Sequence, residues 1–247
     1  MEKVVVALWA PEGEDHAAYG SRILSTLPAA LAAAGAQQIR LNLRDDAVTP
    51  GEGLVQRWQS PQQAAVAQFW MPSANARFRG AVDGALAAHS ARFAAWLVCE
   101  STIIANSSRL APDNSRFLGE TSNNAAPSRT WGWSQASFIS FRPHLSRQQA
   151  IAHWHSHHTR VAIETQSNFE YVQNIIVRPL TDGAPAYDAF VEECFPVEAL
   201  TRPEAFFDAV DQPEQFAANT AAMMESCNGF IDFGRIDIIP TSQFDFA

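Results

Sequence analysis

The chain contains the same pattern of segments twice, and this repeat constrains its fold more than any other feature. The apolar, strand-like run at residues 4–11 has a counterpart at residues 136–143. Likewise, the Phe-Arg-Gly-Ala-Val-Asp run that starts at Phe78 has a counterpart, Phe-Phe-Asp-Ala-Val-Asp, that starts at Phe206. The paired runs lie roughly half a chain length apart. A chain that repeats itself at this distance is expected to fold as two similar units.

Each half is predicted to follow the order β-α-β-β-α-β, which is the ferredoxin-like arrangement. Strands are expected near residues 3–10, 37–45, 63–71 and 93–104, and again near 134–142, 168–178, 187–196 and 230–240. Helices are expected near residues 14–34, 74–88, 147–164 and 203–211, with a further helix near 213–225. The first helix should end at Gly35, because glycine is favoured just beyond the end of a helix.

A four-stranded sheet with both helices on one face leaves its other face uncovered, and two such sheets can cover each other. We therefore predict an α+β fold in which two tandem ferredoxin-like units form a fused α/β barrel. The first half is assigned to residues 1–104 and the second to residues 133–247. Residues 105–132 are rich in Ser, Asn and Pro and are predicted to be a linker or lid.

Charge and composition exclude several classes of function. The net charge is −9 with only 17 Lys and Arg residues and no basic run, which argues against nucleic-acid binding. No apolar stretch approaches the roughly 18 residues of a membrane helix, and the first residues resemble a strand more than a signal peptide. Three widely separated cysteines suit a reducing compartment. The sequence predicts a cytoplasmic protein that does not bind a membrane.

Four of the seven histidines lie within six residues, at positions 153, 155, 157 and 158. Helical spacing places His158 on the same apolar side as Trp154, facing the sheet. There it could reach a barrel interior lined by Phe, Trp and Tyr, be kept neutral by burial, and serve as a general base. The alternative is that His158 is a structural residue. His155 and His157 are expected on the solvent side, and Trp154 in the core or in a cavity wall.

The second half also resembles a known family. The motifs on which the resemblance rests are Phe-Ile-Ser-Phe-Arg-Pro at residues 138–143, Leu-Ser-Arg at 145–147, the pair His153-Trp154 with His158, and Tyr-Val-Gln-Asn at 171–174. Their order resembles the EthD-like branch of the dimeric α/β-barrel superfamily. The resemblance implies that His153 and His158 occupy the family's two histidine positions. Because the first half has no such pair, one working site is expected.

Polar side chains on two strands of the second half are candidates for binding a substrate. Strand alternation sends Tyr171 and Gln173 to one face and Asn174 to the other, and the sequence does not decide which face lines a cavity. Asp188 is a candidate acid that orients a histidine or binds a hydroxyl, or else an exposed carboxylate at a strand end. Trp154 and His155 complete the predicted substrate-binding set.

No metal or cofactor site is expected. His-x-x-His spacing can chelate a cation, but a catalytic zinc site usually has a third ligand, and no cysteine or His-Glu-x-x-His pattern supplies one. The chain has no Gly-x-Gly-x-x-Gly motif, no Walker loop and no Gly-x-Ser-x-Gly elbow. A haem bound through a helix histidine stays open as an alternative.

These observations favour a cofactor-free enzyme that acts on a small hydrophobic, aromatic compound through histidine acid–base chemistry. His158, His153 and Asp188 are its candidate catalytic residues. The resemblance favours a lyase over an isomerase. Two alternatives remain, a non-catalytic accessory protein that binds a small molecule and a haem or metal oxidoreductase. The repeat removes the need for a dimer partner but does not forbid a homodimer.

Overall fold

The computed structural model describes residues 1–106 and 128–246, and each half of the chain forms one antiparallel sheet with helices on one face. The first half contains β1 (Glu2–Trp9), α1 (His16–Ala33), β2 (Gln37–Leu43), β3 (Ala65–Met71), α2 (Ala76–His89) and β4 (Arg92–Ile104). The second contains β6 (Trp133–Ile139), α3 (Arg147–His153), α4 (Thr159–Thr165), β7 (Glu170–Pro179), β8 (Ala189–Phe195), α5 (Pro203–Phe206), α6 (Pro213–Asn228) and β9 (Asp237–Asp245). Both halves follow the predicted order.

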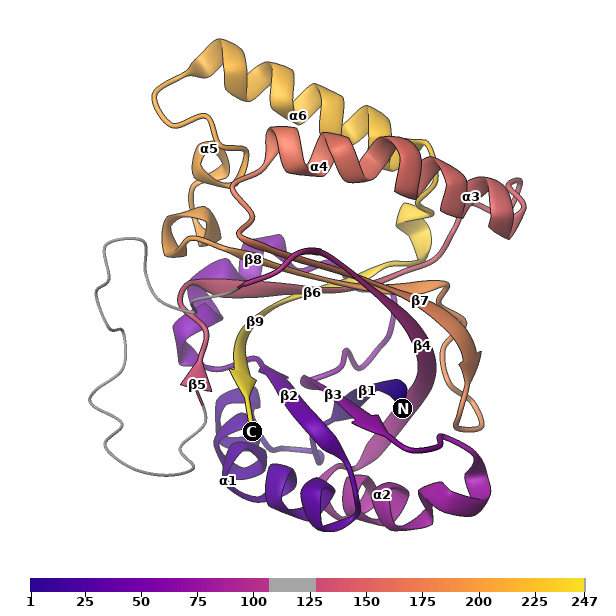
Figure 1. The fold of residues 1–247 in the computed structure, drawn as a ribbon. Helices are drawn as coiled ribbons and strands as arrows, with labels where there is room; N and C mark the ends of the chain where they lie inside the picture. The colour runs from indigo at the N-terminus through magenta and orange to yellow at the C-terminus, as the bar shows by residue number, and fades with distance from the viewer. Residues whose placement is uncertain (107–127, 247) are drawn as a thin grey trace.

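The two sheets join edge to edge and close into a barrel (Figure 1). The strand orders, β2-β3-β1-β4 and β7-β8-β6-β9, are the same in the two halves. β4 pairs with β7, where Glu100 lies opposite Asn174, and β2 pairs with β9, where Arg40 lies opposite Asp245. The predicted fused α/β barrel is confirmed. Closure leaves none of these eight strands with an unpaired edge, and the short β5 (Ser128–Arg129) adds to β9.

Local sequence signals account for where several helices begin and end. Asp15 caps α1 by accepting the Ala18 N–H at 2.9 Å, and α1 is followed by Gly35, whose φ of +94° favours glycine. Ser146 and Gln149 form a capping box at the start of α3. These polar contacts satisfy N–H groups that have no partner within the helix.

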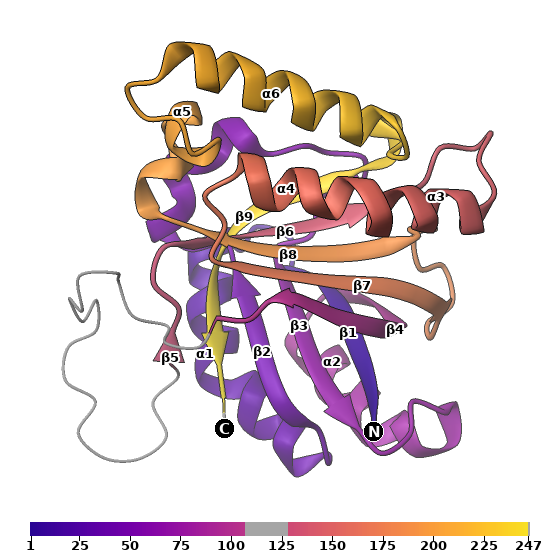
Figure 2. The same ribbon diagram turned by 45° about the horizontal axis from the view of Figure 1, so that its top comes forward.

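The central strands β1, β3, β6 and β8 are buried on both faces, because helices cover the outside of the barrel on two opposite sides (Figure 2). One apolar cluster lies between the first sheet and helices α1 and α2, and another lies between the second sheet and helices α3, α4 and α6. A third fills one end of the barrel and is rich in aromatic rings, among them Trp96, Phe138, Tyr187 and Phe190. Each strand therefore alternates between the barrel interior and a helix layer.

Three segments differ from the predicted elements. The helix expected over residues 147–164 is interrupted by one π-helical turn, η2 (Trp154–His158), in which the Trp154 carbonyl accepts both the Thr159 N–H and the Thr159 hydroxyl. The helix expected over 203–211 is only the four-residue α5, because Asp208 turns the chain with φ of +48°. The last strand begins at Asp237, because Asp232 caps a short 3₁₀ helix, η4 (Phe233–Arg235).

Two further 3₁₀ helices, η1 (Asp46–Leu54) and η3 (Val197–Leu200), complete the described elements. The predicted linker or lid at residues 105–132 falls mostly on residues 107–127, which lie outside the described residues. The boundaries assigned to the two halves stay a prediction. Within the described ranges, no helix combines the length and apolar character needed to cross a membrane.

Candidate functional site

His158 lies in the layer between the second sheet and its helices. Its Nδ1 shares a hydrogen bond of 2.9 Å with the Ser226 hydroxyl of α6, and its ring centroid is 4.9 Å from that of Phe230. Burial, with His153 and His157 nearby, lowers the pKa of His158 to about 4. The ring is therefore neutral at pH 7, and it holds η2 against α6.

His153 makes a second contact with the same residue, since its Nε2 donates to the Ser226 carbonyl at 3.0 Å. His155 and His157 are exposed, as predicted. His153 and His158 thus connect α6 to the helix that carries the histidines, whereas His155 and His157 face solvent.

Trp154, Tyr171 and Gln173 form a hydrogen-bonded group in the same layer. Trp154 Nε1 donates to the Tyr171 hydroxyl at 3.0 Å, and Gln173 Nε2 donates to that hydroxyl and to Thr159 Oγ1, both at 2.8 Å. Glu193 lies opposite Tyr171 on β8. Burial raises the pKa of Glu193 to about 7, although Asn168 donates to its carboxylate at 2.9 Å.

Asp188 is part of the framework at the start of β8 and α3. Its carboxylate accepts the Phe141 N–H at 2.8 Å and pairs with Arg147 at 2.9 Å. These bonds tie the end of β6 to the start of α3. The structure does not bring Asp188 into hydrogen-bond contact with a histidine among the described residues.

The expectation that His158 reaches the barrel interior is wrong, and the reason is geometric. The helix that carries it covers the outer face of the second sheet, so its inward side meets that outer face and α6 (Figure 2). Of the predicted strand residues, Tyr171 and Gln173 share this outer layer, whereas Asn174 points the opposite way, into the barrel.

A cavity of about 830 Å³ opens at the end of the barrel opposite the aromatic cluster. Charged and amide side chains line it, together with the apolar side chains of Ile39, Trp70, Ile104 and Val172. The charged and amide side chains are Lys3, Gln38, Arg40, Gln68, Glu100, Asn106, Glu170 and Asp245. The size is within the usual range for a small-molecule site, about 300–1,000 Å³.

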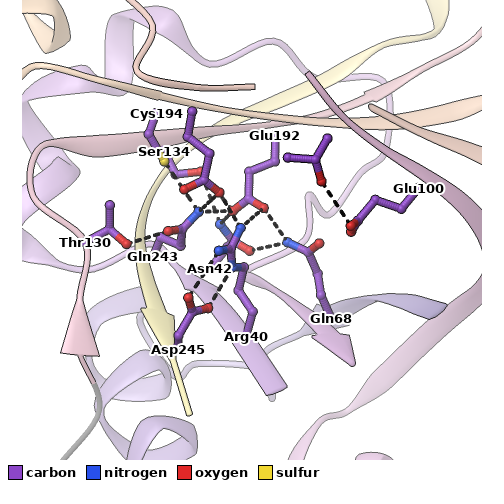
Figure 3. A network of polar contacts seen from close by, with 12 residues as sticks. Arg40, Asn42, Gln68, Glu100, Thr130, Ser134, Glu192, Cys194, Gln243 and Asp245 are labelled. Atoms are coloured by element: carbon purple, nitrogen blue, oxygen red, sulfur yellow. Dashed lines mark hydrogen bonds and ion pairs between the residues drawn. The ribbon is translucent and has the colours of Figure 1, made fainter. Parts of the chain in front are cut away.

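Arg40 and Glu192 are at the centre of a polar network behind this cavity (Figure 3). Arg40 pairs with Glu192 at 2.8 Å, with Asp245 at 2.7 Å and with Glu170. Glu192 has no exposed surface and also accepts from four side chains, Asn42, Gln68, Ser134 and Gln243. Burial acts to raise the pKa of Glu192, but Arg40 and the donors Asn42, Gln243 and Gln68 outweigh it and lower the pKa to about 2.

Lys3 and Glu100 form a second ion pair at the wall of the cavity. Lys3 is almost fully buried, with 5% of its surface exposed. Burial lowers the pKa of Lys3 despite the opposing attraction of Glu100. The Lys3 ammonium therefore releases its proton more readily than a lysine in water does.

Several buried polar atoms around the cavity have no hydrogen-bond partner among the described residues. These atoms are Gln68 Oε1, Glu170 Oε2 and both side-chain amide atoms of Asn174. Asn174 lies directly across from Glu100 on the neighbouring strand and has no exposed surface. Buried polar groups nearly always have partners in proteins, so such atoms mark places where a water or ligand binds.

The cavity residues Lys3, Arg40, Gln68, Glu100 and Glu170, and Glu192 behind them, were not predicted as site residues, although the sequence carries a signal for them. They are isolated charges or amides within otherwise apolar strands, such as Arg40 and Asn42 in Ile-Arg-Leu-Asn-Leu. In a closed barrel, such alternate polar positions face one common interior. Among the described residues, no group of three or more side chains is placed to hold a metal ion.

Replacing Glu192 should destabilise the fold strongly. Glu192→Gln removes the buried charge that Arg40 pairs with, and breaking a buried pair typically costs about 3–5 kcal/mol. The measurement is the free energy of unfolding from urea titration. Glu164→Gln, which breaks the exposed pair with Arg160, is the control and should cost less than about 1 kcal/mol. Equal effects of the two variants would contradict the network's role.

Replacing Glu193 should change how stability depends on pH. The folded-state pKa of about 7 lies above the ordinary value of 4.5, so the folded protein binds this proton more tightly than the unfolded chain. The stability from that proton is complete below pH 4.5 and is lost as the pH rises through 7. The free energy of unfolding of Glu193→Gln should therefore rise relative to that of the wild type between pH 5 and pH 8, by roughly 3 kcal/mol at most.

The measurement is urea unfolding of Glu193→Gln and the wild type at pH 5, 6, 7 and 8. Parallel stability profiles for the two proteins would show that Glu193 does not bind this proton more tightly in the folded state. Glu164→Gln serves again as a control, because Glu164 is exposed.

Among curated proteins, no sequence matches this chain. A crystal structure of an anthrone oxidase-like protein matches all of this chain and 91% of its own, with a TM-score of 0.52 and 10% identity. A putative monooxygenase from Lactobacillus acidophilus NCFM covers 98% of this chain and 93% of its own, with a TM-score of 0.44 and 8% identity. At 10% identity, the likeness to the anthrone oxidase-like protein shows the fold alone.

A mutant chlorite dismutase from Candidatus Nitrospira defluvii covers all of this chain and 91% of its own, with a TM-score of 0.38 and 12% identity. In sequence, residues 142–234 match the EthD domain family. This segment includes the helices that carry the histidines and strands β7 and β8. The resemblance found in the sequence is thereby confirmed for residues 142–234, which match the EthD domain family and lie within a fused α/β barrel.

Proposed function

We propose that the protein binds a small aromatic compound in the barrel cavity and moves a proton on it without a cofactor, in an isomerisation or elimination. The observation that carries this proposal is the cavity itself, where the buried Lys3 pairs with the partly exposed Glu100 beside buried polar atoms that have no partner among the described residues. Perturbed ionisable groups in a concave site are typical of catalysis.

The lining supports an aromatic ligand with polar substituents. Trp70, Ile39 and Val172 provide apolar surface for a ring, and the charged side chains beside them provide hydrogen bonds. Small-molecule sites commonly combine apolar walls with a few placed polar groups.

Lys3 and Glu100 are the residues that we assign to proton transfer. The lowered pKa of Lys3 favours release of its proton to solvent. The resulting amine takes a proton from a carbon that is next to a carbonyl group or conjugated with one through an aromatic ring, and the electrons of the C–H bond move to the carbonyl oxygen as an enolate forms. Return of the proton to a different carbon completes an isomerisation, and loss of a neighbouring leaving group completes an elimination. Glu100 stabilises the ammonium that forms, and Asn174 offers an amide N–H on the adjacent strand.

His158 fits a structural role better than a catalytic one. Its Nδ1 bonds to Ser226, its pKa of about 4 makes it a weak base, and it does not line the cavity of about 830 Å³. The same geometry weighs against a haem held by this helix, since such a histidine faces open space at the metal. His153 is likewise bonded to α6.

Anthrone is a suitable probe, since the fold resembles that of an anthrone oxidase-like protein and anthrone carries exchangeable hydrogens next to its aromatic rings. In D₂O under nitrogen, the wild type should accelerate exchange of the anthrone methylene hydrogens, followed by proton NMR. Lys3→Arg should lower the rate at least about tenfold, because arginine keeps the charge and does not give up its proton.

Two further variants separate the rival assignments. Arg160→Ala, on the exposed face of α4, is the control and should exchange at the wild-type rate. Loss of exchange in His158→Gln with full exchange in Lys3→Arg would instead assign the base to the histidine. Anthrone binding with no acceleration in the wild type would indicate a non-catalytic binding protein. Oxygen consumption in air coupled to anthrone loss would indicate an oxidase.

A further inference from the structure

The spare hydrogen-bonding capacity of the cavity is mainly that of acceptors. Glu170 Oε2 and Gln68 Oε1 are acceptors without a partner among the described residues, and both side chains line the cavity while being at least 98% buried. The two cationic donors and the Gln68 amide are already used. Arg40 donates to three carboxylates, Lys3 donates to Glu100, and Gln68 Nε2 donates to Asn42 and Glu192.

The charged side chains at the cavity also favour a ligand that is positively charged. Among the described residues, three carboxylates line the cavity, at Glu100, Glu170 and Asp245, and Glu192 lies behind them against Arg40. Against these four stand two cations, Lys3 and Arg40, so the formal charge is 2 − 4 = −2. A buried excess of negative charge is costly unless a positive group approaches it.

The ligand that meets both conditions is a hydrogen-bond donor with a positive charge. We propose that the compound bound in this cavity is an aromatic compound with an alkylamine side chain, carried as its ammonium ion, with the ammonium group held by Glu170 and Gln68. This inference rests on the proposed function and adds the class of ligand to it. Trp70 lies in the same wall, where its ring can face the cation or the aromatic body of the ligand.

A metal ion is the other cation to consider. The carboxylates of the network are each engaged by side-chain donors, and no group of three or more metal-ligating side chains is present among the described residues. A cavity of about 830 Å³ is also far larger than a single ion requires. An organic cation fits the space and the acceptors together.

The test uses three ligands of similar size that differ in charge, titrated into the full-length protein by isothermal titration calorimetry at pH 7. They are tyramine, which is a cation, 4-ethylphenol, which is neutral, and 3-(4-hydroxyphenyl)propanoate, which is an anion. Tyramine should bind at least about tenfold more tightly than 4-ethylphenol, and the anion should bind least tightly of the three.

Variants connect this preference to the residues. Glu170→Gln should reduce the ratio of tyramine affinity to 4-ethylphenol affinity to below about threefold, because the carboxylate that faces the ammonium is lost. Glu164→Gln makes the same change on an exposed helix surface and should leave the ratio as in the wild type. Ala32→Trp, at an exposed position that lines the cavity, should weaken all three ligands by obstructing it.

The outcomes are distinguishable. If 4-ethylphenol and the anion bind as tightly as tyramine or more tightly, and Ala32→Trp weakens them, the amine inference is overturned while aromatic binding in the cavity stands. If none of the three binds at millimolar concentration, both the inference and the proposed aromatic ligand are overturned. A tyramine preference that survives Glu170→Gln would also overturn the assignment to Glu170.

Discussion

Glu192 is the residue on which the barrel interior depends. A carboxylate with no exposed surface is stable only where donors surround it, and those donors come from both halves of the chain. Arg40, Asn42 and Gln68 belong to the first half, and Ser134 and Gln243 to the second. The network therefore forms only when the two sheets have closed.

The remaining interior follows from this division. Aromatic rings fill one end of the barrel, and the polar network with its cavity occupies the other. The EthD match covers residues 142–234, yet Lys3, Arg40, Gln68 and Glu100 come from the first half. The half that lacks the family motifs thus supplies much of the cavity wall, so the two halves have become different parts of one site.

The repeat was enough to predict the architecture, because two sheets with one bare face each have few ways to cover themselves. The helices expected from residues 14 and 147 begin in the structure at His16 and Arg147, directly after the capping residues Asp15 and Ser146. It was harder to predict which side chains of each strand point into the barrel and which point toward the helices. Since both faces of strands such as β1 and β8 are buried, their sequences lack the apolar–polar alternation that identifies a core face. The orientation of His158 depended on which face of the sheet its helix covers, and the π turn at residues 154–158 changes the helical phase there.

Both ends of the described chain lie beside the cavity, and this affects how the protein can be handled. Lys3 and Phe246 line the same opening, and Figure 1 shows the two termini on one side of the barrel. An affinity tag joined before Glu2 or after Phe246 therefore starts at the entrance and competes with ligands for it. The loop around Gly183 follows β7, whose first residue, Glu170, lines the cavity, so this loop lies roughly 30 Å further along the strand. A tag or fluorescent label placed there leaves the entrance free.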